Sequence, residues 1–288
     1  MEVACVGDVM LDVHVDAGAL AAGGDVHGRA ALRPGGTSAN AAVWSAWSGA
    51  SSAVVAAIGD DLAGRLCREA VAERGVDVGG VVSRPLPTGV MVVITEAGDR
   101  SMIADRGANA ALEPNDVRRI EASAVLVSGY LFLQEPGHEV ALAALETART
   151  GLLAIEAASW PLIDAFGAGR FFEETSRCDV VLANDREAEA LVGLTGEEAA
   201  RVLGERYRFA AVKRGADGAV LAADGELLKA DAEPIEERES TGAGDAFDGV
   251  LLAELARGRA PLEALARATH AGALVAASSQ TWPEEGAT

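Results

Sequence analysis

The sequence predicts an α/β fold in which helices cover both faces of a mostly parallel sheet, with a small β-sheet projecting from this body. Short apolar runs alternate with helical patterns through most of the chain, and this alternation is typical of βαβ units. Two segments, about 13–33 and 79–104, interrupt it with strand-like runs and turns only. The 288 residues, 50% of them hydrophobic, suffice for one large domain with a substantial core.

The chain opens with elements typical of such a body. Residues 3–9 form an apolar run with the pattern of a buried parallel strand, and Asp12 follows just beyond it. Residues 34–40 combine glycines with small polar residues and open a helix. A strand at 52–58 and a helix at 62–74, stopped by a glycine, complete this part of the body.

The two interrupting segments have the pattern of exposed strands. Runs at 89–95 and 100–104, joined by a Gly-Asp turn, are typical of a β-meander without helices. The segment 13–33 scatters glycines among valines and alanines. We expect 13–33 and 79–104 to meet in one small sheet that acts as a lid on the body.

The second half of the chain resumes the alternation and ends in two helices. The expected strands are 124–128, 152–155, 180–183, 210–214, 219–223 and 227–230, and the expected helices are 137–149, 242–256 and 261–277. In parallel sheets, ligands bind beyond the carboxyl ends of the strands. Polar residues that directly follow these strands are therefore the candidates for a site.

Composition excludes several classes of partner. The chain has 44 acidic and 24 basic residues, a formal charge of −20, which repels nucleic acid and anionic membranes alike. The three cysteines, at 5, 67 and 178, are far apart and odd in number, which suits a reducing compartment. The amino terminus has no signal-peptide pattern, and no apolar stretch is long enough to span a bilayer. We expect a cytoplasmic protein without nucleic-acid or membrane partners.

A glycine turn at the start of a late helix is the strongest candidate site. After Thr241, the backbone N–H groups of Gly242, Ala243 and Gly244 are expected to point out at a helix start, where the helix dipole favours an anion. Asp245 lies inside this turn, and a carboxylate beside a phosphate cradle is suited to take a proton from a nucleophile. The alternative is an acidic first-turn residue that only stabilises its own helix.

Two other helix starts carry polar side chains. Asn40 falls on the same face as Val43 and Trp44, so its amide is expected to point toward the edge where strand ends gather. Asn184 and Glu187 follow the 180–183 strand and could hold a hydrated magnesium ion through waters. Each has a structural alternative: a first-turn capping residue for Asn40, and a capping box for Asn184 with Glu187.

Other phosphate-binding and metal motifs are missing from the sequence. The only lysines are Lys213 and Lys229, and neither follows a glycine, so there is no Walker-A loop. The four histidines are isolated from one another and from the cysteines, which gives zinc little support. Lys213 with Gly215 and Gly218 places a cation and a glycine turn after a strand, although a plain hairpin has the same pattern. The remaining indication is phosphate chemistry without a Walker loop.

These motifs together resemble the ribokinase, or PfkB, family of carbohydrate kinases. The 35–40 helix start, Asn184-x-x-Glu187 and the 241–245 turn occur in the expected order. Residues 59–61 and 107–112 also match familiar stretches of that family. The similarity extends over essentially the whole chain.

The resemblance implies a three-layer ribokinase-like core with a β lid, and ATP-dependent transfer of the γ-phosphoryl group to a sugar hydroxyl with Mg²⁺. By position, Asp245 is the expected base, and the N–H groups of Gly242, Ala243 and Gly244 form the expected anion hole. The expected acceptor-binding residues are Asp12, Gly36, Asn40, Arg106, Asn109 and Tyr130. The expected nucleotide-binding residues are Asn184, Lys213, Gly215, Gly218, Thr241 and His270, and Asn184 with Glu187 is expected to hold Mg²⁺ through water.

Several departures from the family pattern bear on the substrate. Met10 and Thr37 stand where ribokinases proper usually carry Asn and Lys, which argues against ribose. Arg106 could meet an acidic sugar or form a salt bridge in the lid hinge, and Tyr130 could stack on a sugar or base. Glu239 stands where members with a monovalent-cation site usually have Asp, which leaves potassium dependence uncertain.

The leading hypothesis is therefore an ATP-dependent kinase for a sugar or sugar acid. A nucleoside kinase of the same family is the first alternative, although the lid segments contain no aromatic residue to stack on a base. A non-catalytic protein that binds a sugar or nucleotide is the second, and the intact 241–245 turn argues against it. A homodimer through the lid is a further expectation from the resemblance.

Overall fold

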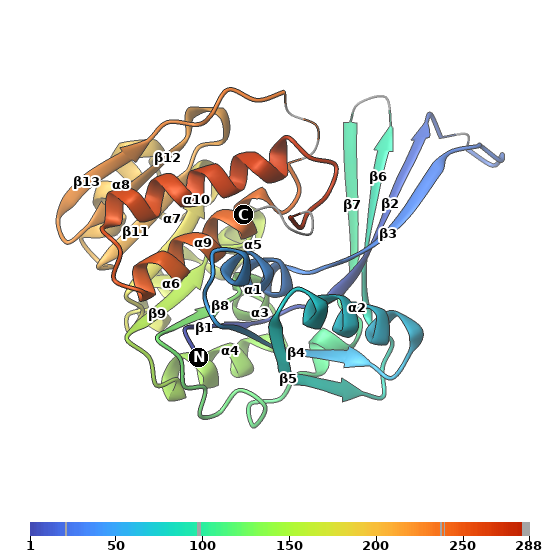
Figure 1. The fold of residues 1–288 in the computed structure, drawn as a ribbon, viewed down its shortest axis with the longest axis horizontal. Coiled ribbons are helices and arrows are strands. Elements are labelled where there is room, and N and C mark those ends of the chain that lie inside the picture. Colours follow the sequence, from blue (N-terminus) through green and yellow to red (C-terminus); the bar gives the residue numbers. More distant parts are fainter. Residues whose placement is uncertain (21, 97–98, 237, 239, 284–288) are drawn as a thin grey trace.

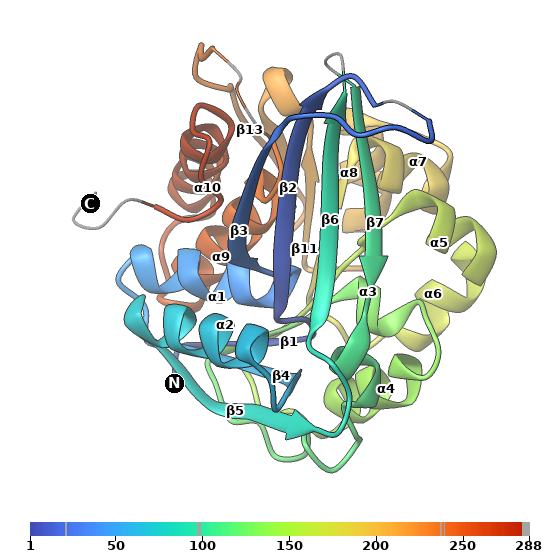
Figure 2. The same cartoon turned by 90° about the vertical axis from the view of Figure 1, so that its right-hand side faces the viewer.

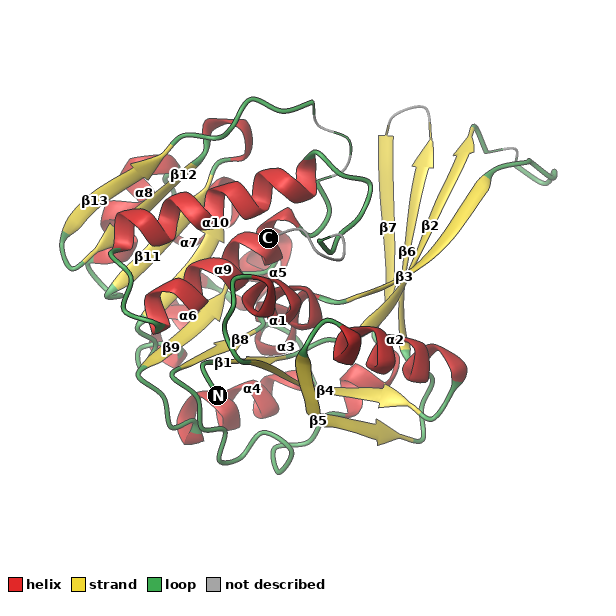
Figure 3. Cartoon of the chain, in the orientation of Figure 1, coloured by secondary structure: helices red, strands yellow, loops and turns green. Residues whose placement is uncertain are grey.

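The computed structural model describes residues 1–20, 22–96, 99–236, 238 and 240–283. A body of helices and strands carries a small sheet that stands at one of its edges (Figures 1 and 3). The expected α/β fold with a separate small sheet is confirmed.

A nine-stranded sheet forms the middle of the body, in the order β13-β12-β11-β10-β9-β8-β1-β4-β5. Neighbouring strands from β5 to β11 run parallel, and β12 and β13 are antiparallel. The strands are β1 (Val3–Val6), β4 (Ser52–Gly59), β5 (Val76–Arg84), β8 (Ala124–Val127), β9 (Leu152–Glu156), β10 (Val180–Asn184), β11 (Phe209–Lys213), β12 (Ala219–Ala223) and β13 (Glu226–Ala230). The inner strands are apolar except at their ends, because helices cover both faces.

Each face of this sheet packs against its own set of helices. One hydrophobic core joins the sheet to α1 (Thr37–Trp47), α2 (Leu62–Glu73), α9 (Ala243–Ala256) and α10 (Pro261–Ala276). The other joins it to α3 (Gly129–Phe132), α4 (Gly137–Thr147), α5 (Trp160–Phe166), α6 (Ala168–Glu174), α7 (Asp185–Val192) and α8 (Gly196–Gly204). Two short 3₁₀ turns connect strands: η1 (Gly107–Ala111) precedes β8, and η2 (Gly215–Asp217) lies between β11 and β12.

The small sheet has four strands in the order β3-β2-β6-β7. They are β2 (Met10–Gly18), β3 (Arg29–Gly35), β6 (Gly89–Glu96) and β7 (Asp99–Asp105), and the parallel pairing of β2 with β6 joins the two separate chain segments. Figure 2 shows these strands side by side in front of the body. The expected boundaries need correction at two points. The sheet begins at Met10, and residues 79–84 belong to β5, because they continue the parallel pairing with β4 that starts at Val76.

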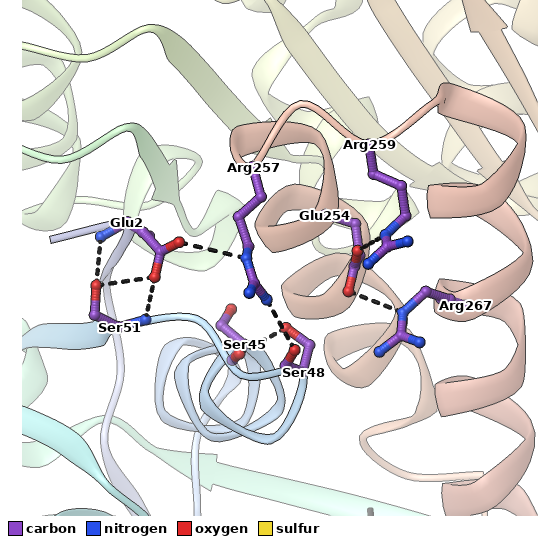
Figure 4. Close-up of polar contacts among 8 residues, drawn as sticks. All are labelled: Glu2, Ser45, Ser48, Ser51, Glu254, Arg257, Arg259 and Arg267. Atoms are coloured by element: carbon purple, nitrogen blue, oxygen red, sulfur yellow. Dashed lines mark hydrogen bonds and ion pairs between the residues drawn. The ribbon is translucent and has the colours of Figure 1, made fainter.

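Helix α9 lies between α1 and α10 and is buried over most of its length. At its end, the fully buried Glu254 carboxylate accepts hydrogen bonds from Arg259 and Arg267 (Figure 4). Arg257 directly follows α9, and its Nε lies 3.4 Å from Oε1 of Glu2 at the start of the chain. These ion pairs hold one end of α9 and so help to fix the position of its first turn.

In the described ranges, no helix combines the length and the apolar character needed to cross a membrane.

Candidate active site

A cavity of about 990 Å³ lies between the small sheet and the carboxyl ends of the body strands. Most of the residues singled out from the sequence meet in it. Those that line the cavity are Asp12, Gly36, Asn40, Arg106, Tyr130, Asn184, Glu187, Lys213, Gly215, Gly218, Thr241, Gly242, Ala243, Gly244 and Asp245.

The glycine turn forms the start of α9, as expected. Gly242 is the residue before the helix and adopts φ +84°, a left-handed conformation that favours glycine. A Cβ atom there would lie 2.3 Å from a methyl carbon of Thr281, so the site also excludes a side chain for lack of space. One of the expected anion donors is already engaged, since the Ala243 N–H donates to the carbonyl of Ser240 at 3.1 Å.

Asp245 lies in the first turn of α9, partly buried. Its Oδ2 accepts a hydrogen bond from Asn40 Nδ2 at 2.7 Å. Burial raises the pKa of the Asp245 carboxyl from its ordinary 3.8 to about 7; Asp248 adds to this rise, whereas the Asn40 hydrogen bond and Lys213 oppose it. A carboxylate with a pKa near neutrality is well matched to general-base work.

Asn40 lines the cavity and also forms a hydrogen bond with Asp245. Its Nδ2 donates to Asp245, and its Oδ1 accepts from the indole Nε1 of Trp282 at 2.7 Å. The side chain is 4% exposed. From the sequence, Asn40 was expected to bind the acceptor through its amide; in the structure, both polar atoms of this amide have a protein partner.

Lys213 brings a positive charge beside the glycine turn. Its Nζ donates to Asp248 Oδ2 at 2.7 Å, and a Cβ atom on Gly244 would lie 3.4 Å from the same Nζ. Burial works against the charged form, but Asp248, Glu187 and Glu156 outweigh it and hold the pKa of Lys213 above its usual range. The ammonium group therefore stays charged, next to the turn.

Asn184 and Glu187 form the capping box that was the structural alternative. Asn184 Oδ1 accepts from the Glu187 N–H at 3.0 Å, and the Glu187 carboxylate accepts from the Asn184 N–H at 2.8 Å. Both side chains nevertheless line the cavity, together with Glu156. Burial raises the pKa of Glu187 and of Glu156, and their mutual repulsion adds to the rise for Glu156. Mg²⁺ keeps several of its waters in proteins, so a pair of oxygen-bearing side chains at the cavity wall fits a water-mediated site.

The opposite end of the cavity is polar on the side of the body and apolar on the side of the small sheet. Arg106 Nη2 lies 2.8 Å from Asp8 Oδ1, and the same guanidinium donates to the Tyr130 carbonyl. The salt bridge was one of the two interpretations of Arg106. From the lid, Met91 and Met102 line the cavity beside Asp12.

Two residues from the sequence analysis are not brought to the cavity wall. Asn109 is 1% exposed, and its amide exchanges hydrogen bonds of 3.0 and 3.1 Å with the backbone of Val9, linking η1 to the residue before β2. His270 pairs through Nδ1 with Glu233 Oε1 at 2.7 Å, and it is Glu233 that lines the cavity. Glu239, considered for a monovalent cation, lies outside the described residues.

Four residues of the site were not found from the sequence. Asp8 and Glu156 lie at the ends of the parallel strands β1 and β9, a position that could have marked them. Asp248, one turn beyond Asp245, could have been read from helical spacing. For Trp282 no local signal exists, because its contact with Asn40 joins residues 242 positions apart.

The chain is similar to known proteins over most of its length. The sequence model of the pfkB family carbohydrate kinases matches residues 1–284. The 2-dehydro-3-deoxygluconokinase of Thermoproteus tenax is 31% identical over 257 residues, which cover 83% of this chain and 78% of that protein.

Solved structures of kinases share the fold. The adenosine kinase from Sinorhizobium meliloti superposes with a TM-score of 0.85 at 22% identity, covering 98% of this chain and 96% of that one. The aminoimidazole riboside kinase from Salmonella enterica, solved with aminoimidazole riboside and an ATP analog, gives 0.79 at 22% identity over 98% and 95%. With the match to the family over nearly its whole length, the chain belongs to the PfkB family of carbohydrate kinases.

Proposed function

We propose that this protein transfers the γ-phosphoryl group of ATP to a hydroxyl of a sugar, with Asp245 as the general base. The observation that carries this proposal is the carboxylate of Asp245, with its pKa near 7, at the glycine turn that opens α9. At neutral pH about half of a carboxyl group with this pKa is ionised and able to accept a proton. The helix start beside it favours the phosphate groups of a nucleotide.

The residues around the turn have complementary tasks. Asp245 accepts the proton of the attacking hydroxyl, and Asp12 accepts a hydrogen bond from the sugar and so orients it. The backbone N–H groups of Gly242 and Gly244, with the ammonium of Lys213, stabilise the negative charge that develops on the transferred group. The lid excludes water from the reacting groups.

The nucleotide is proposed to lie along the other half of the cavity, against Thr241, Gly215 and Gly218. Asn184 and Glu187 would hold Mg²⁺ through water. When bound, this ion neutralises phosphate charge and orients the γ-phosphoryl group.

The acceptor we favour is a neutral sugar. Arg106 is the cation at the acceptor end, and Asp8 already balances its charge at 2.8 Å, so a carboxylate on the substrate would compete with Asp8. A nucleoside is the second candidate, because Met91 and Met102 offer an apolar cover that a base could use. The kinases that act on adenosine and aminoimidazole riboside are consistent with this second choice.

The test is a panel of sugars, sugar acids and nucleosides with Mg-ATP, scored by ADP release. We expect acceptor-dependent release from the wild type and a loss of at least about a hundredfold in Asp245→Asn. Asp60→Asn is the matched control, because its side chain is 90% exposed and on the surface. Equal release from wild type and Asp245→Asn would overturn the base assignment, and no acceptor-dependent release with any compound would favour the non-catalytic binding protein.

Two further properties are part of the proposal. A cytoplasmic location is supported by the need for ATP and by three free thiols, Cys5, Cys67 and Cys178, all buried. A homodimer through the lid is supported by an apolar row on the face away from the cavity, in which Leu32 and Ile103 are each 61% exposed.

A further inference from the structure

The last described residues of the chain fold back onto the amino-terminal helices. The indole Nε1 of Trp44, in α1, donates to the carbonyl of Thr281 at 2.9 Å. Arg74, at the end of α2, donates to the carbonyl of Pro283, and its guanidinium lies 5.6 Å from the ring centre of Trp282. Trp282 is thereby held in a buried position, 8% exposed.

From this position Trp282 begins a chain of hydrogen bonds that ends on the carboxylate of the proposed base. Its Nε1 donates to Asn40 Oδ1 at 2.7 Å, and Asn40 Nδ2 donates to Asp245 Oδ2 at 2.7 Å. An indole nitrogen can only donate, so the oxygen of the Asn40 amide must face Trp282. The NH₂ group must then face Asp245.

We propose that Trp282 is a positioning residue for phosphoryl transfer: by fixing the orientation of the Asn40 amide, it keeps an N–H donor on the carboxylate of Asp245. The proposal rests on the assignment of Asp245 as the base. Trp282 does not line the cavity among the described residues, and it acts only through Asn40.

The effect follows from what the amide does to the ionised carboxylate. A donor on a carboxylate favours its charged form, whereas a reversed amide would place an oxygen against it. The groups that interact electrostatically with Asp245 from the elements around it are Cys5, Asp12, Tyr130, Glu156, Lys213 and Asp248. Replacing Trp282 by phenylalanine changes none of these charges, so a shift in the titration of Asp245 would not come from a lost or added charge.

The experiment compares Trp282→Phe with Trp44→Phe. Trp44→Phe is the matched control, since it also removes an indole N–H bonded to the same carboxy-terminal segment but leaves the Asn40 amide untouched. The first readout is the acid limb of kcat/KM against pH, with Mg-ATP and the best acceptor of the panel. The second readout needs no substrate. Each protein and its Asp245→Asn counterpart are unfolded in urea between pH 5 and 9, and the difference between their free energies of unfolding reports the titration of Asp245.

We expect Trp282→Phe to move both readouts to higher pH by about one unit, which lowers activity at pH 6 about tenfold and leaves it near that of the wild type at pH 9. Trp44→Phe should move neither. Asn40→Ala, the second variant, should give a similar shift, and adding Trp282→Phe to it should add nothing.

Two results would overturn the proposal. One is an unchanged titration of Asp245 in Trp282→Phe, and the other is an equal shift in Trp44→Phe, which would assign the effect to packing of the segment. If no acceptor is found, the unfolding readout still tests whether Trp282 affects the titration of Asp245 through Asn40. Failure of the proposed function and failure of this inference are therefore distinguishable.

Discussion

Asp245 should make the protein less stable as the pH rises, and Asp245→Asn should remove that dependence. The pKa of the carboxyl is about 7 in the folded protein against an ordinary 3.8. The stability that the protonated form contributes is fully present below about pH 4 and is lost as the pH rises through 7. Asparagine has no such titration, and its side-chain oxygen can still accept the hydrogen bond from Asn40.

The size of the effect follows from the shift in pKa. A rise of about 3 units corresponds to about 4 kcal/mol between the two limits of pH. The cavity beside Asp245 admits water, which screens the carboxylate, so we expect about half of this, about 2 kcal/mol.

The assay is urea unfolding of the wild type and of Asp245→Asn at intervals from pH 5 to pH 8.5. The excess stability of the variant should grow with pH and level off above about 7.5. The Asp60→Asn control should follow the wild type, because its carboxylate is exposed to solvent. A stability difference that is the same at every pH would refute both the raised pKa and the argument from burial.

The other predictions concern the ion pairs and the lid. Lys213→Met should lower kcat with Mg-ATP by about 10²-fold, measured by steady-state ADP release, because the ammonium beside the glycine turn is lost; an unchanged kcat would contradict that role. Replacing Arg259 and Arg267 together by methionine should lower the free energy of unfolding, measured in urea, by about 3–5 kcal/mol. The reason is that the buried carboxylate of Glu254 then loses both of these arginine partners. Glu254→Gln should cost only about 1–2 kcal/mol, since both guanidinium groups are partly exposed and can turn to water; the reverse order would count against this account. Ile103→Glu should convert the proposed lid dimer into monomers in sedimentation velocity, because it places a charge on the exposed apolar face of the lid. A wild-type protein that sediments as a monomer would contradict the proposal of a lid dimer.

The sequence predicted the elements whose cause is local. Apolar runs between helical patterns marked the parallel strands, because strands buried on both faces are nearly continuous apolar runs. The glycine turn before α9 was predicted because a left-handed residue such as Gly242 requires glycine. The boundary of the small sheet was less well predicted. Residues 79–84 begin with two glycines and look like lid strands, and only their pairing with β4 assigns them to the body.

The candidate site was predicted as a set of positions and only partly as a set of contacts. Residues after parallel strands gather at one edge whatever their partners are, so most of the expected residues reached the cavity. Which atom each of them bonds depends on neighbours in space. The amide of Asn109, for example, is occupied by the backbone of Val9, 100 positions away.

By itself, then, the sequence determined the α/β fold with its small sheet, the family, and the carboxylate at the glycine turn, since these depend on local pattern and the order of motifs. Only the tertiary structure decided the state of that carboxylate. Its pKa is set by burial and by Lys213 and Asp248, and its hydrogen bond by Asn40 and Trp282. Asn40 and Trp282 come from opposite ends of the chain, and Lys213 comes from a strand of the body. An electrostatic interaction depends on distance in space, which separation along the sequence does not encode.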